Sequence, residues 1–103
     1  MLVPFPFTDL SGNKVRPCLV LSEQKNGEDC ILSFISSVKR TRTGVFDIPV
    51  KATKANGLKT DSVIKIDKIA TLQKKIILGE LGMAEPALMK AIDMRLKKLF
   101  QLR

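Results

Sequence analysis

The sequence predicts one small, mainly β domain with a single C-terminal helix, in which short strands form a barrel or a sandwich. Short apolar runs recur along the first three quarters of the chain, between segments rich in Gly, Asn and Ser. A helical spacing of apolar residues begins only near residue 85. The chain shows no repeat or linker, and 45% of its 103 residues are hydrophobic, which predicts one domain with a modest core over residues 1–103.

The N-terminal segments predict an edge strand, a loop and an internal strand. Residues 2–7 contain Pro4 and Pro6, which cannot donate to a strand ladder and therefore favour a sheet edge or a strand end. Residues 8–15 are polar and are expected to form a loop. Residues 17–22 include an apolar run of strand length, which predicts the first internal strand.

A hairpin turn is expected to lead into a second buried strand. The pair Asn26-Gly27 favours the backbone of a tight hairpin turn. Residues 30–35 are almost wholly apolar, and this strand is expected to end at Ser36 and Ser37.

The middle of the chain predicts loops that alternate with strands. Residues 39–44 are expected to form a basic loop, and residues 45–50, which include Pro49, a second edge strand. A loop over residues 51–61 precedes a strand over residues 62–72, whose first part alternates between apolar and charged side chains.

The C-terminal segment predicts a helix that packs on the sheet. Residues 74–81 are compatible with either a last strand or an irregular segment. Pro86 suits the first turn of a helix, and Glu85 suits its N-terminal end. Five apolar residues fall on one helical face: Leu88, Ile92, Leu96, Leu99 and Phe100. This face is expected to pack in the core, and a contact between two copies of the chain is the alternative.

The chain is strongly basic, with a formal net charge of +8 and an isoelectric point near 9.8. Between Lys39 and Lys59, six basic residues stand against one acid, Asp47. This segment favours a polyanionic partner such as nucleic acid, although a solvated surface would have the same composition. The absence of Trp and Tyr argues against an aromatic platform for stacking bases.

Missing residue types exclude several kinds of site. The chain has no histidine, which excludes His-based acid–base catalysis and His-ligated metals. It has no CxxC, no P-loop and no dinucleotide-binding glycine pattern, so no metal or cofactor is expected. Cys18 and Cys30 lie in apolar runs and are expected to be buried free thiols. Without a signal peptide or an apolar run of membrane-spanning length, a cytoplasmic location is expected.

Arg16 is a candidate for binding a phosphate. Pro17 favours an extended backbone at Arg16, so the guanidinium would project from a rigid strand end. A rim arginine without a special role is the alternative. Lys65 and Asp67 are predicted on one face of the strand over residues 62–72, either as site residues or as a solvent-exposed charge pair.

Three segments, in order, resemble the PemK/MazF toxins of type II toxin–antitoxin systems. The opening of that family resembles residues 3–12 (VPFPFTDLSG) and 14–21 (KVRPCLVL) of this chain. Residues 57–68 (GLKTDSVIKIDK) resemble its second signature, and residues 35–37 (ISS) occupy the strand end between the two. The resemblance implies an SH3-like small β-barrel of the PemK/MazF/CcdB type.

The resemblance also implies a function and partners. Most members of the family are homodimeric toxins that cut single-stranded mRNA at short sequences without a metal, which inhibits translation and growth. The 2′-hydroxyl of the RNA is the nucleophile, and a 2′,3′-cyclic phosphate results. The implied protein partner is an antitoxin with an acidic, flexible tail, and DNA would be bound only through the antitoxin complex. The alternatives are a non-catalytic gyrase poison of the same fold and an inactive nucleic-acid-binding module.

Roles for particular residues follow from the same resemblance. Arg16 matches a catalytic arginine and is expected to stabilise the charge of the pentavalent phosphate. Ser36, where many members have Thr, would orient a phosphate oxygen. Asp67 would accept the 2′-hydroxyl proton, and Lys65, where some members have Arg, would bind phosphate or support Asp67. The residues expected to bind RNA are Thr8, Asp9, Ser11, Asn13, Lys14, Ser37, Lys39 and Arg40.

Overall fold

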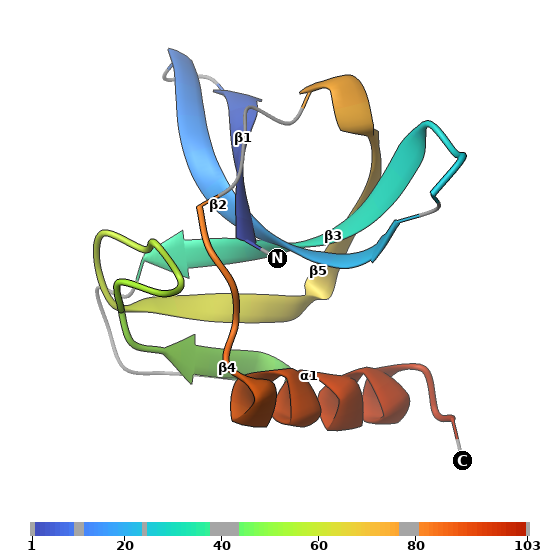
Figure 1. Cartoon of the computed structure of the whole chain (residues 1–103). Helices are drawn as coiled ribbons and strands as arrows, with labels where there is room; N and C mark the ends of the chain where they lie inside the picture. Colours follow the sequence, from blue (N-terminus) through green and yellow to red (C-terminus); the bar gives the residue numbers. More distant parts are fainter. Residues whose placement is uncertain (1, 10–11, 24, 38–43, 77–80, 103) are drawn as a thin grey trace.

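The residues that the computed structural model describes, 2–9, 12–23, 25–37, 44–76 and 81–102, form a mainly β fold with one C-terminal helix, as the sequence predicts. The strands are β1 (Leu2–Asp9), β2 (Gly12–Glu23), β3 (Asp29–Ser37), β4 (Asp47–Val50) and β5 (Ser62–Gln73). A short 3-10 helix, η1 (Lys74–Ile76), follows β5, and helix α1 (Pro86–Leu99) comes last (Figure 1).

The strands join one antiparallel sheet in the order β1-β2-β3-β5-β4. Both edge strands contain proline, Pro4 and Pro6 in β1 and Pro49 in β4. Because proline has no N–H to donate, its place at an edge leaves no ladder bond unmade inside the sheet. The two predicted edge strands are therefore confirmed. β5 lies between β3 and β4, so it pairs on both sides.

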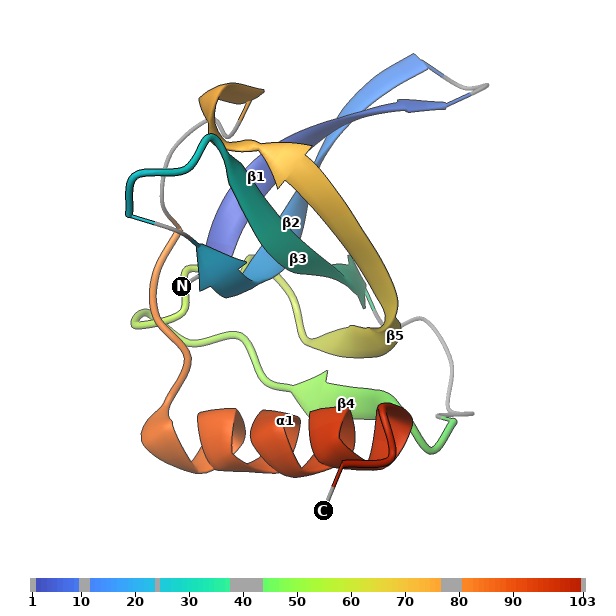
Figure 2. The ribbon, with the colours of Figure 1, turned by 90° about the vertical axis from the view of Figure 1, so that its right-hand side faces the viewer.

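Two irregularities of register curl the sheet towards a small barrel. β2 carries one extra residue between Val20 and Ser22 relative to β3. In β5, three extra residues, 66–68, lie opposite the step from Ser33 to Phe34. Bulges of this kind bend a strand and increase its twist. Figures 1 and 2 show β5 turning sharply between its two halves.

The loop predicted over residues 8–15 is wrong, because the ladder between β1 and β2 extends as far as the pair Asp9 and Gly12. Residues 10–11 lie outside the described part of the chain. A polar segment is as compatible with an extended hairpin as with a loop, and strand pairing decides between the two. Arg16 consequently lies inside β2, opposite Phe5, and not where a loop joins a strand.

Helix α1 packs against the β4 and β5 side of the sheet and closes the main core (Figure 2). Pro86 occupies its first turn, and Ile92 is fully buried. The other buried members of the main core are Leu19, Ile35, Ile48, Leu58, Ile64 and Ile66, with Leu88, Leu96 and Leu99 packed against them. Phe100 departs from the predicted face. It is the C-cap residue, and 57% of its surface is exposed.

A second, smaller core lies on the opposite face of the sheet. It consists of Cys18, Cys30 and Leu32, with Val20, Phe34 and Leu72 packed against them. Neighbouring residues in a strand point to opposite faces, so Leu19 joins the main core and Cys18 the smaller one. Both cysteines are buried and free, as predicted.

The predicted loop between β4 and β5 is present and is closed by the buried side chain of Asn56. Its Oδ1 accepts hydrogen bonds from the N–H groups of Thr53 and Leu58, each at 3.0 Å. Its Nδ2 donates to the carbonyl of Lys51 at 2.8 Å. The next residue, Gly57, has a positive φ of 73°, a backbone conformation that glycine adopts without steric cost.

Candidate functional site

The strand register places three of the predicted site residues on one face of the sheet. Cys18 lies opposite Phe34, and Phe34 lies opposite Lys65. Alternate residues of a strand share a face, so Arg16 lies on the side of Cys18 and Ser36 on the side of Phe34. Arg16, Ser36 and Lys65 therefore share the face that carries the smaller core, and each of the three is partly exposed. We call this the polar face.

Three neighbouring strands contribute to the polar face: β2, β3 and β5. Neighbouring strands are spaced by about 4.8 Å, and Arg16 is offset from Lys65 by two residues along the strands, so their backbones lie roughly 12 Å apart across β3. A guanidinium, an ammonium and a hydroxyl form a donor set suited to an oxyanion such as a phosphodiester.

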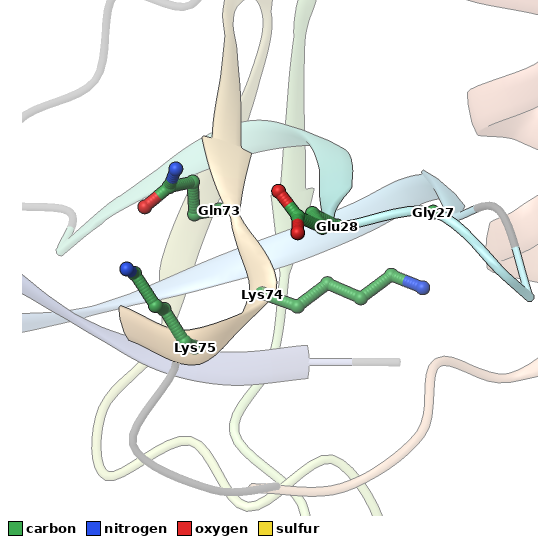
Figure 3. Close-up of a pocket in the computed structure, with 5 residues that line it drawn as sticks. All are labelled: Gly27, Glu28, Gln73, Lys74 and Lys75. Carbon is green, nitrogen blue, oxygen red and sulfur yellow. The ribbon is translucent and has the colours of Figure 1, made fainter.

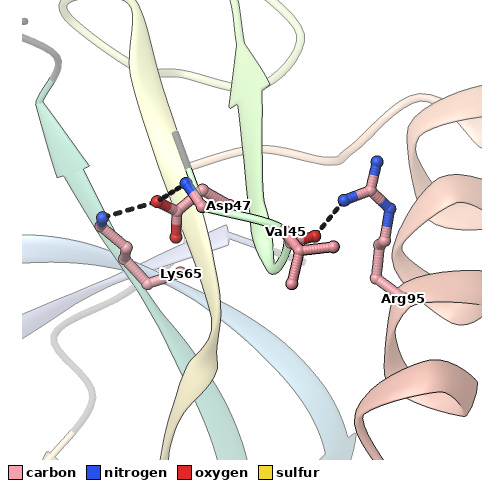
Figure 4. A network of polar contacts seen from close by, with 5 residues as sticks. Val45, Asp47, Lys65 and Arg95 are labelled. Atoms are coloured by element: carbon pink, nitrogen blue, oxygen red, sulfur yellow. Dashed lines mark hydrogen bonds and ion pairs between the residues drawn. The ribbon is translucent and has the colours of Figure 1, made fainter. Parts of the chain in front are cut away.

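Lys65 forms an ion pair with Asp47 of the edge strand β4. Its Nζ donates to Oδ2 of Asp47 at 3.0 Å, and the two residues lie opposite each other in the ladder. The Asp47 side chain is only 11% exposed, whereas that of Lys65 is 35% exposed. An ammonium has three N–H donors, so this bond still permits Lys65 to bind a phosphate. Figure 4 shows the pair.

The electrostatics of Asp47 favour its ionised form. Burial raises the pKa of this carboxyl, but hydrogen bonds from the Gly44 N–H, at 2.9 Å, and from Lys65 outweigh burial. The net result is a pKa below its ordinary value. A carboxylate of this kind is a weak base, and it serves best as a fixed counter-charge that orients Lys65.

The partner of Lys65 differs from the one that the strand pattern predicts. An unbroken strand would display Lys65 and Asp67 side by side, yet Lys65 pairs with Asp47. The register between β4 and β5 places Asp47 directly opposite Lys65, whereas Asp67 is exposed in the bulge at residues 66–68. Sequence reasoning missed Asp47, although a single acid among six bases was a signal that it has a local partner.

The residues expected to bind RNA are only partly placed. Ser37 is exposed at the end of β3. The backbones of Thr8 and Asp9 belong to β1 and those of Asn13 and Lys14 to β2, but their side chains lie outside the described part of the structure. Ser11, Lys39 and Arg40 lie outside the described residues altogether. Of the predicted basic segment, Lys51, Lys54 and Lys59 are exposed.

Other chemistry near the polar face is limited. Burial, followed by the proximity of Cys30, raises the pKa of the Cys18 thiol to about 12, so Cys18 is no thiolate nucleophile at neutral pH. Burial likewise raises the pKa of Cys30. Among the described residues, no cluster of three or more His, Cys, Asp or Glu side chains could hold a metal ion. No described helix is long and apolar enough to cross a membrane.

A separate cavity of about 300 Å³ lies at the far end of β5 from Ser62. Its lining residues are Gly27, Glu28, Gln73, Lys74 and Lys75, from the turn before β3 and the step from β5 into η1 (Figure 3). None of the predicted site residues contributes to it. Glu28 places a carboxylate among the lysines, so this cavity lacks the purely cationic lining of a phosphate site.

Comparison with known proteins agrees with the fold and identifies a family. A family model described as PemK-like, MazF-like toxin of type II toxin–antitoxin system matches residues 1–100. Among solved structures, the Mycobacterium tuberculosis toxin MazF-mt6 is similar with a TM-score of 0.75 and 22% identity, over 97% of this chain and 98% of that one. None of the curated proteins matches the chain.

Two further structures share the fold. One is an endoribonuclease in complex with its cognate antitoxin from a mycobacterial species, with a TM-score of 0.73 and 20% identity, over 98% of this chain and 93% of that one. The other is an endoribonuclease from a mycobacterial species, with a TM-score of 0.68 and 22% identity, over 96% of this chain and 88% of that one. At such identities the structural similarity establishes only the fold. Membership of the family rests on the match of the family model over residues 1–100.

Proposed function

Because the chain belongs to the PemK-like, MazF-like toxins of type II toxin–antitoxin systems, we propose that it is a metal-independent, sequence-specific endoribonuclease that cleaves single-stranded mRNA. The observation that supports this proposal is the polar face, which Arg16, Ser36 and Lys65 share on three adjacent strands. Two cations and a hydroxyl at one place match a phosphodiester whose negative charge increases in the transition state.

The proposed reaction takes its nucleophile from the substrate. The 2′-oxygen loses its proton and attacks the adjacent phosphorus, and the bond from phosphorus to the 5′-oxygen breaks as that oxygen takes a proton from water. The products are a 2′,3′-cyclic phosphate and a 5′-hydroxyl. A chain without histidine can perform this reaction, because the protein has only to bind the phosphate, stabilise its charge and move protons.

Each residue of the polar face has a distinct proposed role. Arg16 stabilises the pentavalent phosphate, and Ser36 donates a hydrogen bond to one of its oxygens. Lys65, oriented by Asp47, binds a second oxygen. Asp67, exposed in the adjacent bulge, accepts the proton of the 2′-hydroxyl.

The proposed partners follow from charge and from the family. An acidic, flexible antitoxin tail would bind a chain of net charge +8 and cover the polar face. One structural neighbour is an endoribonuclease in complex with its cognate antitoxin, which supports an antitoxin partner here. We further propose a homodimer that acts in the cytoplasm and contacts DNA only through the antitoxin complex.

Cleavage of a long single-stranded RNA in EDTA, with both ends of each cut mapped, tests this function. The expected result is discrete cuts at one short sequence, with cyclic phosphates on the upstream fragments. Arg16→Ala should lower the rate at least about 100-fold, a loss typical of removing one charge-stabilising donor. Lys90→Ala removes a positive charge from an exposed position on α1 and should cleave like the wild type.

Two outcomes would contradict the proposal. Arg16→Ala with full activity would show that the polar face is not the catalytic centre. A folded wild-type protein that cuts no RNA but causes gyrase-dependent DNA breaks would be a gyrase poison of the same fold.

A further inference from the structure

We propose that Arg95 of helix α1 is a positioning residue, which holds the turn before β4 so that Asp47 keeps Lys65 in place on the polar face. This inference rests on the proposed function, in which Lys65 binds the reacting phosphate. It assigns a role in that function to a residue of helix α1, which packs on the opposite face of the sheet.

The first link joins α1 to the chain just before β4. A terminal guanidinium nitrogen of Arg95 donates a hydrogen bond to the carbonyl oxygen of Val45 (Figure 4). Arg95 lies one helical turn after Ile92, which is fully buried in the main core. The base of the Arg95 side chain is therefore fixed by core packing, and its charge strengthens the bond to the carbonyl.

The second link runs through the turn itself. The N–H of Asp47 donates to the Gly44 carbonyl at 3.1 Å, and the Gly44 N–H donates to Oδ2 of Asp47 at 2.9 Å. Val45 lies between these two residues. A bond that fixes the Val45 carbonyl therefore fixes the backbone that presents the Asp47 carboxylate.

The third link reaches the polar face. The same Oδ2 of Asp47 accepts the hydrogen bond from Lys65 at 3.0 Å. Next along the turn, the carbonyl of Phe46 accepts the N–H of Ile66 at 2.9 Å, directly beside Lys65. The bond from Arg95 to Val45 and the bond from Lys65 to Asp47 are thus connected through the backbone of the turn (Figure 4).

The hydrogen bonds above and the packing of Phe46 on the main core hold part of the turn, and Arg95 adds a contact at its exposed residue, Val45. Val45 is 51% exposed, so it contributes little packing. β4 has only four residues and is an edge strand, so it has ladder bonds on one side only. Edge segments with few bonds open most easily. The charged donor Arg95, on a helix that packs in the core, therefore limits the motion of the turn before β4.

A double-mutant cycle tests the inference. Arg95→Met removes the donor but keeps an apolar side chain and a high helix propensity. The control is Lys90→Met, which removes one positive charge from the same helix. We expect Arg95→Met to lower kcat roughly five- to tenfold, within the range of coupling in one hydrogen-bond network, with little change in KM. In a Lys65→Met background the same substitution should have almost no effect. Arg95→Lys should restore part of the rate.

A second readout does not depend on RNA cleavage. The pKa of Asp47, followed by NMR of its carboxyl carbon, should rise towards the ordinary value in Arg95→Met and stay unchanged in Lys90→Met. If the wild type cuts no RNA, the proposed function fails while this titration still decides whether Arg95 orders the turn. An unchanged Asp47 titration, or an equal kcat loss with and without Lys65, would overturn the inference.

Discussion

A single oxygen, Oδ2 of Asp47, accepts hydrogen bonds from two parts of the chain, the Gly44 N–H and the Lys65 ammonium. This arrangement defines what each group can do. The carboxylate is held ionised and engaged, so it is poorly suited to take a proton from a substrate. Asp47 holds the Lys65 ammonium before any ligand binds, which would lower the entropic cost of the proposed binding of a phosphate.

Replacing Asp47 with Asn should destabilise the fold most at neutral pH and least in acid. The pKa of Asp47 is lower in the folded chain than in the unfolded one, so its ionised form stabilises the fold at every pH above the unfolded value, near 3.9. That contribution is lost as the pH falls through the folded value. Urea unfolding of both proteins between pH 3 and pH 7 measures the difference.

The control for this comparison is Asp93→Asn, which changes an exposed carboxyl on α1. It should shift the free energy of unfolding only slightly across the range. An Asp47→Asn difference that stays constant down to pH 3 would mean that the ionised pair contributes nothing to stability.

At the scale of elements, the sequence predicts the edge strands and the helix, but it does not predict the order in which the strands pair. Prolines identified both edges, and the helical spacing identified α1, because these signals are local. The pairing of Lys65 with Asp47 is not local. It requires β4 to pair with β5 in the register that sets Asp47 opposite Lys65. This register leaves no clear mark in the composition of the segments, so the sequence pointed to Asp67 as the neighbour of Lys65.

The loop over residues 51–61 approaches the segment before α1 closely, and this contact gives a test at the scale of elements. Gly57 has a positive φ of 73°, and a Cβ added there would lie 2.2 Å from the carbonyl oxygen of Leu81. Gly57→Ala should therefore cost about 2 kcal/mol or more, which corresponds to roughly 10 °C in Tm. At Gly44 a Cβ would lie 3.7 Å from the Asp47 carboxylate, an ordinary contact.

Gly44→Ala is accordingly the matched control, with a change in Tm of no more than about 3 °C. Thermal unfolding followed by circular dichroism measures both variants. Equal losses in the two would mean that backbone freedom in general, and not the close approach to Leu81, explains the effect.

At the scale of the whole molecule, the two faces of the curled sheet have different tasks. One face packs against α1 and forms the main core. The other is the polar face, which carries the smaller core together with Arg16, Ser36 and Lys65. The site residues belong to strands whose opposite face is buried, so their backbones are held rigidly. The bond from Arg95 reaches the turn before β4, and Asp47 after that turn contacts Lys65 on the other face, which is the proposed route from the helix to the site.

The net charge of +8 raises the question of whether RNA binding uses particular lysines or only the overall field. Each phosphate neutralised on single-stranded RNA contributes about 0.7 to the slope of log K against log salt concentration. If the exposed Lys51, Lys54 and Lys59 contact phosphates, their joint change to Ala should lower that slope by about 2.

The matched variant changes three exposed lysines of α1, Lys90, Lys97 and Lys98, and removes the same charge. Fluorescence anisotropy with a labelled RNA, with Arg16→Ala in both backgrounds to prevent cleavage, measures the two slopes. If both triple variants lose slope equally, overall charge attracts the RNA, whereas a loss confined to the first assigns the loop after β4 to the path of the RNA backbone.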